Sequence, residues 1–296
     1  MTERARPRGL AAALLFASAL ASPVAHAVQQ DDEVPFVATP QQNVERMLAM
    51  AKPGPEDFLI DLGSGDGRFV ITAAQRYGTR ALGVEIDGWL LKKSQDQARE
   101  AGVANLVEFR NQDLFETDLS QATVVTMYLL ESVNLKLRPR LLAQLRPGSR
   151  VVSHHYAMGA WKPDQQRHEP GERYPVFLWI VPADVGGVWE TTVPLDRNRE
   201  RTYRVNLVQS FQEIAGHARS DELTLIVNEP RLSGDRIELR VTDELDAGRI
   251  TWHASGRVVG ERIEGTVRVG GVNALQLPIP VREFPWRATR IRRSAR

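Results

Sequence analysis

The stretch Asp61-Leu62-Gly63-Ser64-Gly65-Asp66-Gly67 decides the fold of this chain. It begins at the end of an apolar run (residues 58–61) that is typical of a buried strand, and it leads into an amphipathic run (residues 67–77) that is typical of a helix. Glycines in such a loop allow a tight turn and let a ligand approach the backbone without a Cβ in the way. Amide groups at the start of the helix would face that ligand. The pattern therefore predicts a strand, a ligand-binding loop and a helix.

Strands and helices alternate along the rest of the first half of the chain. We expect strands at residues 58–61, 81–85, 106–110, 123–128 and 150–154, and helices at residues 41–51, 67–77, 88–101 and 135–145. Strict alternation of this kind predicts a parallel sheet with helices on both faces. Because connections between parallel strands are right-handed, the expected fold is a Rossmann-like, doubly wound α/β sheet.

The pattern changes after about residue 182. Short runs of alternating apolar and polar residues follow, and glycine-containing turns separate them at intervals of roughly ten residues. This rhythm predicts an antiparallel β-rich domain, either a sandwich or a small barrel. We therefore divide the chain into a targeting segment (residues 1–27), an α/β domain (residues 28–185) and a smaller accessory domain (residues 186–296).

The first residues are typical of a secretory signal peptide. Arg4, Arg6 and Arg8 precede a short apolar run at residues 9–21, and Ala25-His26-Ala27 has the small-x-small form that signal peptidase cuts. The apolar run is shorter than the roughly twenty residues that anchor a chain across a bilayer. We expect cleavage after Ala27, no transmembrane anchor in the mature chain, and export, with the periplasm as the destination.

The composition excludes several kinds of chemistry. The chain has no cysteine, which removes thiol catalysis, disulfides and cysteine-bound zinc. A net charge of +1 gives no general attraction for nucleic acid, so no nucleic-acid partner is expected. Five arginines crowd the C-terminus, and we expect them to form a solvated, frayed end: Arg287, Arg290, Arg292, Arg293 and Arg296.

Three carboxylates favour S-adenosylmethionine (SAM) over a dinucleotide as the ligand of the glycine loop. Asp61 lies where a pyrophosphate would approach, and a carboxylate is unfavourable there, whereas the methionine ammonium of SAM is a cation that a carboxylate attracts. Glu85 ends the next strand and can accept the two ribose hydroxyls. Asp113 follows the third strand and can accept the adenine amino group, although alone it is equally typical of a turn. We predict that SAM binds Asp61, Gly63, Ser64, Gly65, Gly67, Glu85 and Asp113.

Four segments also resemble a known family. These are Val34-Pro-Phe-Val-Ala-Thr-Pro40, the Asp61 loop, residues 111–119, and Thr126-Met-Tyr-Leu-Leu130 followed by Asn134-Leu-Lys-Leu-Arg-Pro139. They resemble the small class I methyltransferases related to the mitochondrial lysine methyltransferases of the ATP synthase c-subunit and the adenine nucleotide translocator. The resemblance covers residues 34–165. It implies SAM-dependent transfer of a methyl group to a lysine-like protein amine, and it places Thr39 near the methionine end of SAM.

Methyl transfer is expected at the carboxyl edge of the sheet, where Tyr128 ends the fourth strand and His154 ends the fifth. Tyr128 is a candidate for orienting the acceptor. His154 is a candidate base for an amine whose pKa is near 10.4 in water. Simple packing at a strand end is the alternative for both residues, and it has more weight for His154 than for Tyr128. Neighbouring residues of a strand face opposite sides, so His154 and His155 cannot hold one metal ion together, and no metal site is expected.

The sequence thus predicts a class I SAM-dependent methyltransferase that acts on a protein or small-molecule acceptor. Two alternatives stay open. The first is an exported protein that binds SAM without turnover, because SAM is made in the cytoplasm. The second is an interaction module of the cell envelope, built on the β-rich domain.

Overall fold

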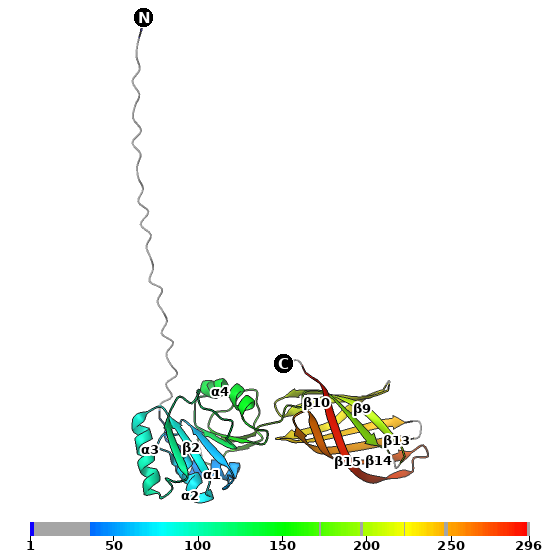
Figure 1. Cartoon of the computed structure of the whole chain (residues 1–296), viewed down its shortest axis with the longest axis horizontal. Helices are drawn as coiled ribbons and strands as arrows, with labels where there is room; N and C mark the ends of the chain where they lie inside the picture. The colour runs from blue at the N-terminus through cyan, green and yellow to red at the C-terminus, as the bar shows by residue number, and fades with distance from the viewer. Residues whose placement is uncertain (3–35, 172, 196–197, 222, 246–247, 295–296) are drawn as a thin grey trace. The chain divides into compact units, whose positions relative to one another are not determined.

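The computed structural model describes residues 1–2, 36–171, 173–195, 198–221, 223–245 and 248–294. The expected signal peptide and its cleavage site after Ala27 lie outside the described residues, apart from the first two. The described chain forms two separate sheets, a seven-stranded open sheet and a closed barrel (Figure 1).

The open sheet has the strand order β3-β2-β1-β4-β5-β7-β6. Strands β1 to β5 pair in parallel, and the order reverses between β1 and β4. In sheets of this type a ligand binds at this reversal, beyond the carboxyl ends of the strands. The strands are β1 (Phe58–Leu62), β2 (Arg80–Glu85), β3 (Val107–Asn111), β4 (Val124–Met127), β5 (Arg150–His154), β6 (Gln165–Arg167) and β7 (Val176–Ile180).

Helices cover both faces of this sheet, as predicted. They are α1 (Gln41–Ala51), α2 (Arg68–Tyr77), α3 (Gly88–Glu100) and α4 (Glu131–Gln144). Helices α1 and α2 pack with Leu59, Val124 and Val152 on one face, while α4 packs with Ile60 and Val125 on the other (Figure 1). Successive strand residues thus alternate between two cores. None of the helices that the structure describes is long and apolar enough to cross a membrane.

The sheet differs from the prediction at one edge, where it is mixed rather than wholly parallel. Strand β7 runs antiparallel to β5, and β6 runs antiparallel to β7. A parallel neighbour for β5 would need a long crossover, usually a helix. The segment between β5 and β7 contains Pro163, Pro170 and Pro175, which disfavour a helix, so the chain turns back instead.

The second sheet is an up-and-down antiparallel barrel of eight strands, closed by pairing of β8 with both β9 and β15. Alternating residues fill its interior, including the buried Trp189, Trp252 and Trp286. Of the two architectures left open by the sequence, the barrel is the one formed. Its strands are β8 (Gly187–Pro194), β9 (Glu200–Ser210), β10 (Glu213–Ser220), β11 (Leu223–Ser233), β12 (Arg236–Leu245), β13 (Gly248–Val259), β14 (Arg262–Asn273) and β15 (Pro278–Arg293).

The expectation of a frayed C-terminus is wrong as far as Arg293, because β15 extends to that residue and closes the barrel. The side chain of Arg290 is buried, with its guanidinium carbon 4.6 Å from the centre of the Trp189 ring. It donates a hydrogen bond of 3.1 Å to the carbonyl of Gly186. A cation over an aromatic face is attracted by the ring quadrupole, and this contact holds the strand in place.

Candidate active site

The glycine loop connects β1 to α2 and has a backbone that only glycine adopts easily. Gly63, Gly65 and Gly67 have positive φ angles of 74°, 53° and 79°. A Cβ on Gly67 would lie 2.8 Å from the ring of Phe109, and one on Gly65 would overlap the ring of Phe36. Side chains are therefore excluded on both sides of the loop.

Asp61 is buried at the carboxyl end of β1, next to this loop. Its Oδ1 accepts a hydrogen bond of 2.7 Å from the Thr126 hydroxyl, whereas Oδ2 has no hydrogen-bond partner among the described residues. Burial raises the pKa of Asp61 to about 8, and the charges of Glu85 and Asp66 contribute. A cation placed against Oδ2 would stabilise the carboxylate, so the site fits the ammonium group of SAM.

The hydroxyl oxygen of Ser64, within the loop, is a second buried polar atom without a hydrogen-bond partner among the described residues. The backbone N–H of Ser64, in contrast, donates to the Val84 carbonyl at 2.9 Å. Buried polar atoms are nearly always paired in folded proteins. The unpaired oxygens of Asp61 and Ser64 therefore indicate a polar ligand beside the loop.

Glu85 at the end of β2 joins the loop to the neighbouring strand. Its Oε2 accepts a hydrogen bond of 2.8 Å from the Gly65 N–H. Its Oε1 accepts from the N–H groups of Ile86 and Asp87 at 2.9 and 3.0 Å. The carboxylate is thereby held in one orientation, and its remaining lone pairs can accept hydrogen bonds from ribose hydroxyls. Glu85 thus both shapes the loop and presents an acceptor at the sheet edge.

Asp113 lies after β3 in an exposed turn. Its Oδ1 accepts a hydrogen bond of 2.7 Å from the Phe115 N–H, which is the turn geometry that the sequence left open. This contact leaves Oδ2 for another donor. The role of Asp113 in binding adenine stays a prediction.

Sequence reasoning missed how Asp66 and Arg68 bind the preceding segment to the loop. Arg68 forms hydrogen bonds with both oxygens of Asp66 at 2.8 and 2.6 Å, and its Nη1 donates to the Thr39 carbonyl at 2.5 Å. Burial acts to raise the pKa of Asp66, but the hydrogen bonds and charge of Arg68 hold it below its usual value. Thr39 is buried beside the loop, and its contact with SAM stays a prediction.

The register of the strands places the remaining candidates in one row. Asp61 pairs with Thr126 across β1 and β4, and Thr126 pairs with Val152 across β4 and β5. Two residues further on, Tyr128 and His154 follow on the same face, with ring centres 4.3 Å apart. The structure therefore brings Asp61, Tyr128 and His154 to one face of the carboxyl edge.

His154 is buried and positioned by α1. Its Nε2 lies 3.0 Å from Asn43 Nδ2, and Arg46 Nη1 donates to Asn43 Oδ1 at 3.2 Å. Because Arg46 requires an oxygen acceptor, the Asn43 amide nitrogen faces the histidine, so Nε2 is the acceptor of this pair. The lone pair of Nε2 is thus already used. The role of His154 as a base stays a prediction.

Further rings extend this row into an aromatic cluster, which we define as Tyr128, His154, His155, Tyr156 and Tyr174. His154 and His155 were expected to face opposite sides of one strand. Strand β5 ends at His154, however, and His155 has a φ angle of 71°, which is outside the extended conformation. Its ring stacks at 3.5 Å on Tyr174 and at 3.9 Å on Tyr156. Burial raises the pKa of Tyr128, which stays a neutral phenol at neutral pH. The cluster offers an apolar wall with hydroxyl groups.

Comparisons with known proteins agree with this arrangement. Residues 61–165 match the family described as the ANTKMT methyltransferase domain. A protein-lysine N-methyltransferase of Saccharolobus islandicus is 40% identical over 151 residues, which are 50% of this chain and 94% of that protein. An adenine nucleotide translocase lysine N-methyltransferase of Mus musculus is 34% identical over 131 residues, covering 44% of this chain and 57% of the mouse protein. A solved RNA methyltransferase of Salinibacter ruber, in complex with S-adenosyl-L-homocysteine, is 51% identical, covers 55% of this chain and 100% of that chain, and has a TM-score of 0.49.

A Rossmann-like sheet, a glycine loop with a buried acid before it, and a carboxylate on the next strand define a class I SAM-dependent methyltransferase. The chain belongs to the methyltransferase family of the Saccharolobus relative, nearly all of whose length it covers. Its methyl donor is SAM. The family match lies within the α/β domain, and the barrel is outside it.

Proposed function

We propose that this enzyme methylates the side-chain amine of a lysine in a protein. The observation that carries the proposal is the aromatic cluster, which begins at the carboxyl ends of β4 and β5 on the face that also holds Asp61. The names of the Saccharolobus and mouse relatives support the same acceptor. A long, flexible amine is the protein group that best reaches a recessed methyl donor.

The chain's own residues bind and orient the two reactants. Asp61 and Ser64 offer buried oxygens to the methionine end of SAM, and Glu85 offers its carboxylate to the ribose. When bound, SAM supplies a methyl group on its positively charged sulfur, and the rest of the molecule leaves as the neutral thioether S-adenosylhomocysteine. The protein therefore contributes alignment more than bond-breaking chemistry.

The acceptor amine must be neutral to react. Removal of the amine from water disfavours the ammonium form and lowers the pKa of the amine, which favours loss of its proton before transfer. Tyr128, a neutral phenol with a raised pKa, can accept a hydrogen bond from an N–H of the amine and so direct the amine lone pair toward the methyl group. His154, fixed by Asn43, packs against the Tyr128 ring and keeps it in place.

The test uses the purified protein, tritiated SAM and a cell extract divided into protein, RNA and lipid fractions. The proposal expects label in protein, and acid hydrolysis should release it as methyl-lysine. An extract whose lysines were acetylated beforehand is the matched control and should take up no label. Label confined to RNA, or to protein residues other than lysine, would refute the proposed acceptor.

We also propose that the mature enzyme starts at Val28 and acts outside the cytoplasmic membrane. The basic start, the short apolar run and Ala25-His26-Ala27 support this location. The lack of cysteine suits an exported chain, which meets an oxidising compartment.

A further inference from the structure

The outer wall of the barrel carries a row of polar side chains, Arg240, His253 and Arg268, that methyl transfer does not use. The register places Arg240 opposite His253, and His253 opposite Arg268. Within the described residues, no ion pair or hydrogen bond engages Arg240 or Arg268, while Glu238 lies 3.9 Å from His253. The register also places Glu283 opposite Arg268 and Asn228 opposite Arg240. Both guanidinium groups therefore have polar neighbours, but no ion pair among the described residues holds them away from an anion.

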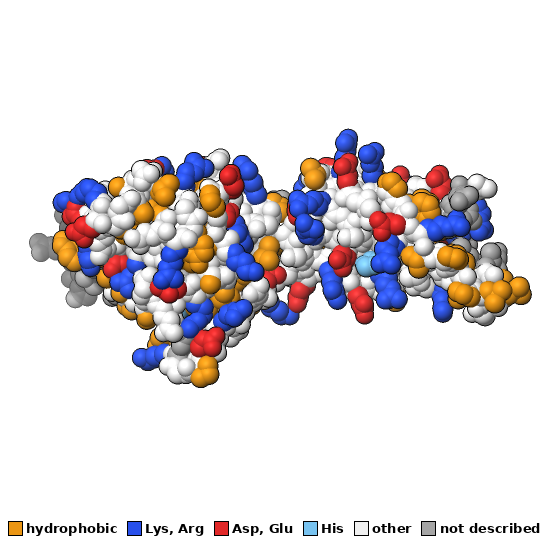
Figure 2. Space-filling view, turned by 90° about the horizontal axis from the view of Figure 1, so that it is seen from below, with side chains coloured by type: hydrophobic (Ala, Val, Ile, Leu, Met, Phe, Trp, Pro, Cys, Tyr) orange, Lys and Arg blue, Asp and Glu red, His pale blue; other side chains and the backbone are white. Residues whose placement is uncertain are grey.

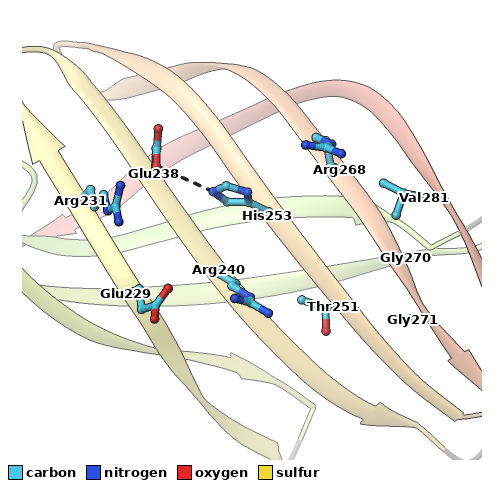
Figure 3. Close-up of a pocket in the computed structure, with 10 residues that line it drawn as sticks. All are labelled: Glu229, Arg231, Glu238, Arg240, Thr251, His253, Arg268, Gly270, Gly271 and Val281. Carbon is cyan, nitrogen blue, oxygen red and sulfur yellow. Dashed lines mark ion pairs between the residues drawn. The ribbon is translucent and has the colours of Figure 1, made fainter.

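This row crosses a hollow of about 500 Å³ in the barrel wall (Figure 3). Irregular pairing flanks it on both sides, between Asn228 and Arg231 in β11 and between Val269 and Gly271 in β14. Such bulges re-aim side chains and occur beside binding sites. Gly270 and Gly271 place no side chain in the hollow, which is lined by Glu229, Arg231, Glu238, Arg240, Thr251, His253, Arg268, Gly270, Gly271 and Val281.

An exposed apolar tip adjoins the hollow. The turn between β14 and β15 is fixed by Asn273, whose Oδ1 accepts from the N–H groups of Leu275 and Leu277 at 2.9 and 3.0 Å. Leu275 is 78% exposed, Leu277 55% and Val281 61%, and Val281 also lines the hollow. Figure 2 shows apolar side chains gathered at one end of the barrel, with cationic ones nearby. The exposed leucines therefore lie close to the arginines of the hollow.

We propose that this surface docks on an anionic lipid bilayer, with a lipid phosphate in the hollow and the Leu275–Leu277 turn in the headgroup region. Apolar side chains beside cations are the pattern by which proteins bind membrane surfaces. The barrel's cations are all arginines, since no lysine follows Lys162, and arginine matches phosphate with paired hydrogen bonds. Two exposed leucines in the turn and Val281 in β15 are too few for a stable protein interface, which buries about 800 Å² on each partner.

The test is sedimentation of the purified full chain with vesicles of phosphatidylcholine, with or without phosphatidylglycerol. We expect binding to the mixed vesicles, weak binding to phosphatidylcholine alone, and loss of binding in about 0.5 M salt. The double variant Arg240→Gln/Arg268→Gln should bind about fivefold more weakly per arginine. The variant Leu275→Ser/Leu277→Ser should lose at least tenfold. Arg219→Gln and Val259→Ser change exposed residues elsewhere on the barrel and should bind as the wild type does.

Several outcomes would overturn the proposal. One is equal binding to both kinds of vesicle, and another is unchanged binding by both double variants, with near-ultraviolet circular dichroism showing each variant folded. Binding of inorganic phosphate that needs the arginines, without any vesicle binding, would make the hollow a site for a free phosphate. Self-association that needs Leu275 and Leu277, without vesicle binding, would make the turn a contact between copies of the chain.

Discussion

Protonation of a single residue, Asp61, should make SAM binding depend on pH. Its pKa is raised to about 8 by burial, so at about pH 6.5 the carboxyl group is protonated before SAM binds. The ammonium of SAM favours the carboxylate, and binding should therefore release close to one proton. Calorimetry in two buffers with different ionisation enthalpies measures this release. A binding enthalpy that is the same in both buffers would contradict the contact between Asp61 and the ammonium.

The variant Asp61→Asn is the control, because its amide oxygen can still accept from Thr126. It should bind SAM more weakly and without buffer dependence. Asp61→Asn should weaken SAM binding but increase the stability of the fold at high pH. The folded wild type keeps the proton up to about pH 8, whereas the unfolded chain releases it near the ordinary carboxyl pKa of 3.8, so wild-type stability falls as pH rises between these values. The variant lacks this fall and should melt at a higher temperature than the wild type at about pH 8.

Tyr128 should affect the rate of transfer more than the binding of SAM. If its hydroxyl orients the amine, Tyr128→Phe lowers kcat about tenfold, as expected for a lost hydrogen bond, while SAM affinity stays nearly unchanged. Stopped-time methylation assays and calorimetry separate the two quantities. Tyr77→Phe, at the end of α2, is the matched control. A silent Tyr128→Phe would show that the ring only packs against His154.

Sequence patterns identified the acids of the site but not the contacts that hold them. Asp61 and Glu85 were predictable because each ends a strand next to the glycine loop. The pairing of Asn43 with His154 spans 111 residues, and nothing local to either residue indicates it. The contact of Arg68 with the Thr39 carbonyl likewise depends on the folded chain. The local sequence pattern therefore does not predict the role of a residue that depends on contacts with distant parts of the chain.

At the scale of elements, the junction between the loop and α2 should tolerate no side chain at Gly67. Its φ angle is 79°, and a Cβ would lie 2.8 Å from Phe109 and from Ser94. Gly67→Ala should destabilise the fold by about 1–3 kcal/mol. Gly88→Ala is the control, because a Cβ at the start of α3 meets nothing within 4 Å, and it should be neutral or stabilising by up to about 1 kcal/mol. Denaturant titration compares them; equal stability of the two variants would contradict the tight junction.

Helices and strands whose first residues follow a recognisable sequence pattern were predicted well, whereas the start of α4 and strand β7 were not. The prediction placed the start of α4 at Leu135, whereas the helix starts at Glu131. Its N-cap is Leu130, whose side chain makes no capping hydrogen bond, so the usual start signal is missing. Strand β7 is a continuous apolar run like β1, but it was not predicted because no helical pattern precedes it to continue the alternation of strands and helices.

At the scale of the whole molecule, the closure of the barrel could not be predicted. Alternation along β9 to β15 predicts antiparallel strands, but a sandwich and a barrel share that pattern. The difference depends on β8 pairing with β15, from Gly187 to Arg293, across the length of the domain. The same pairing explains why the C-terminal arginines form a strand rather than a frayed end.

The location of the enzyme is testable on the native protein. We expect Edman sequencing or mass spectrometry of the protein from its own host to find Val28 at the N-terminus, and fractionation to recover it outside the cytoplasmic membrane. A full-length chain that retains Met1 in the cytosol would contradict export.

The central claim is catalysis, and the most direct test is peptide mass spectrometry after incubation with SAM carrying a deuterated methyl group. The substrate is protein extract from the host envelope and, separately, from its cytosol. With the wild type we expect deuterated methyl groups on lysine side chains. With Glu85→Ala we expect a yield about ten- to hundredfold lower at limiting SAM, because this variant loses the charged hydrogen bonds to the ribose. If the wild type binds SAM but labels no lysine in either extract, the chain is a SAM-binding protein without turnover on lysine, and the account is wrong.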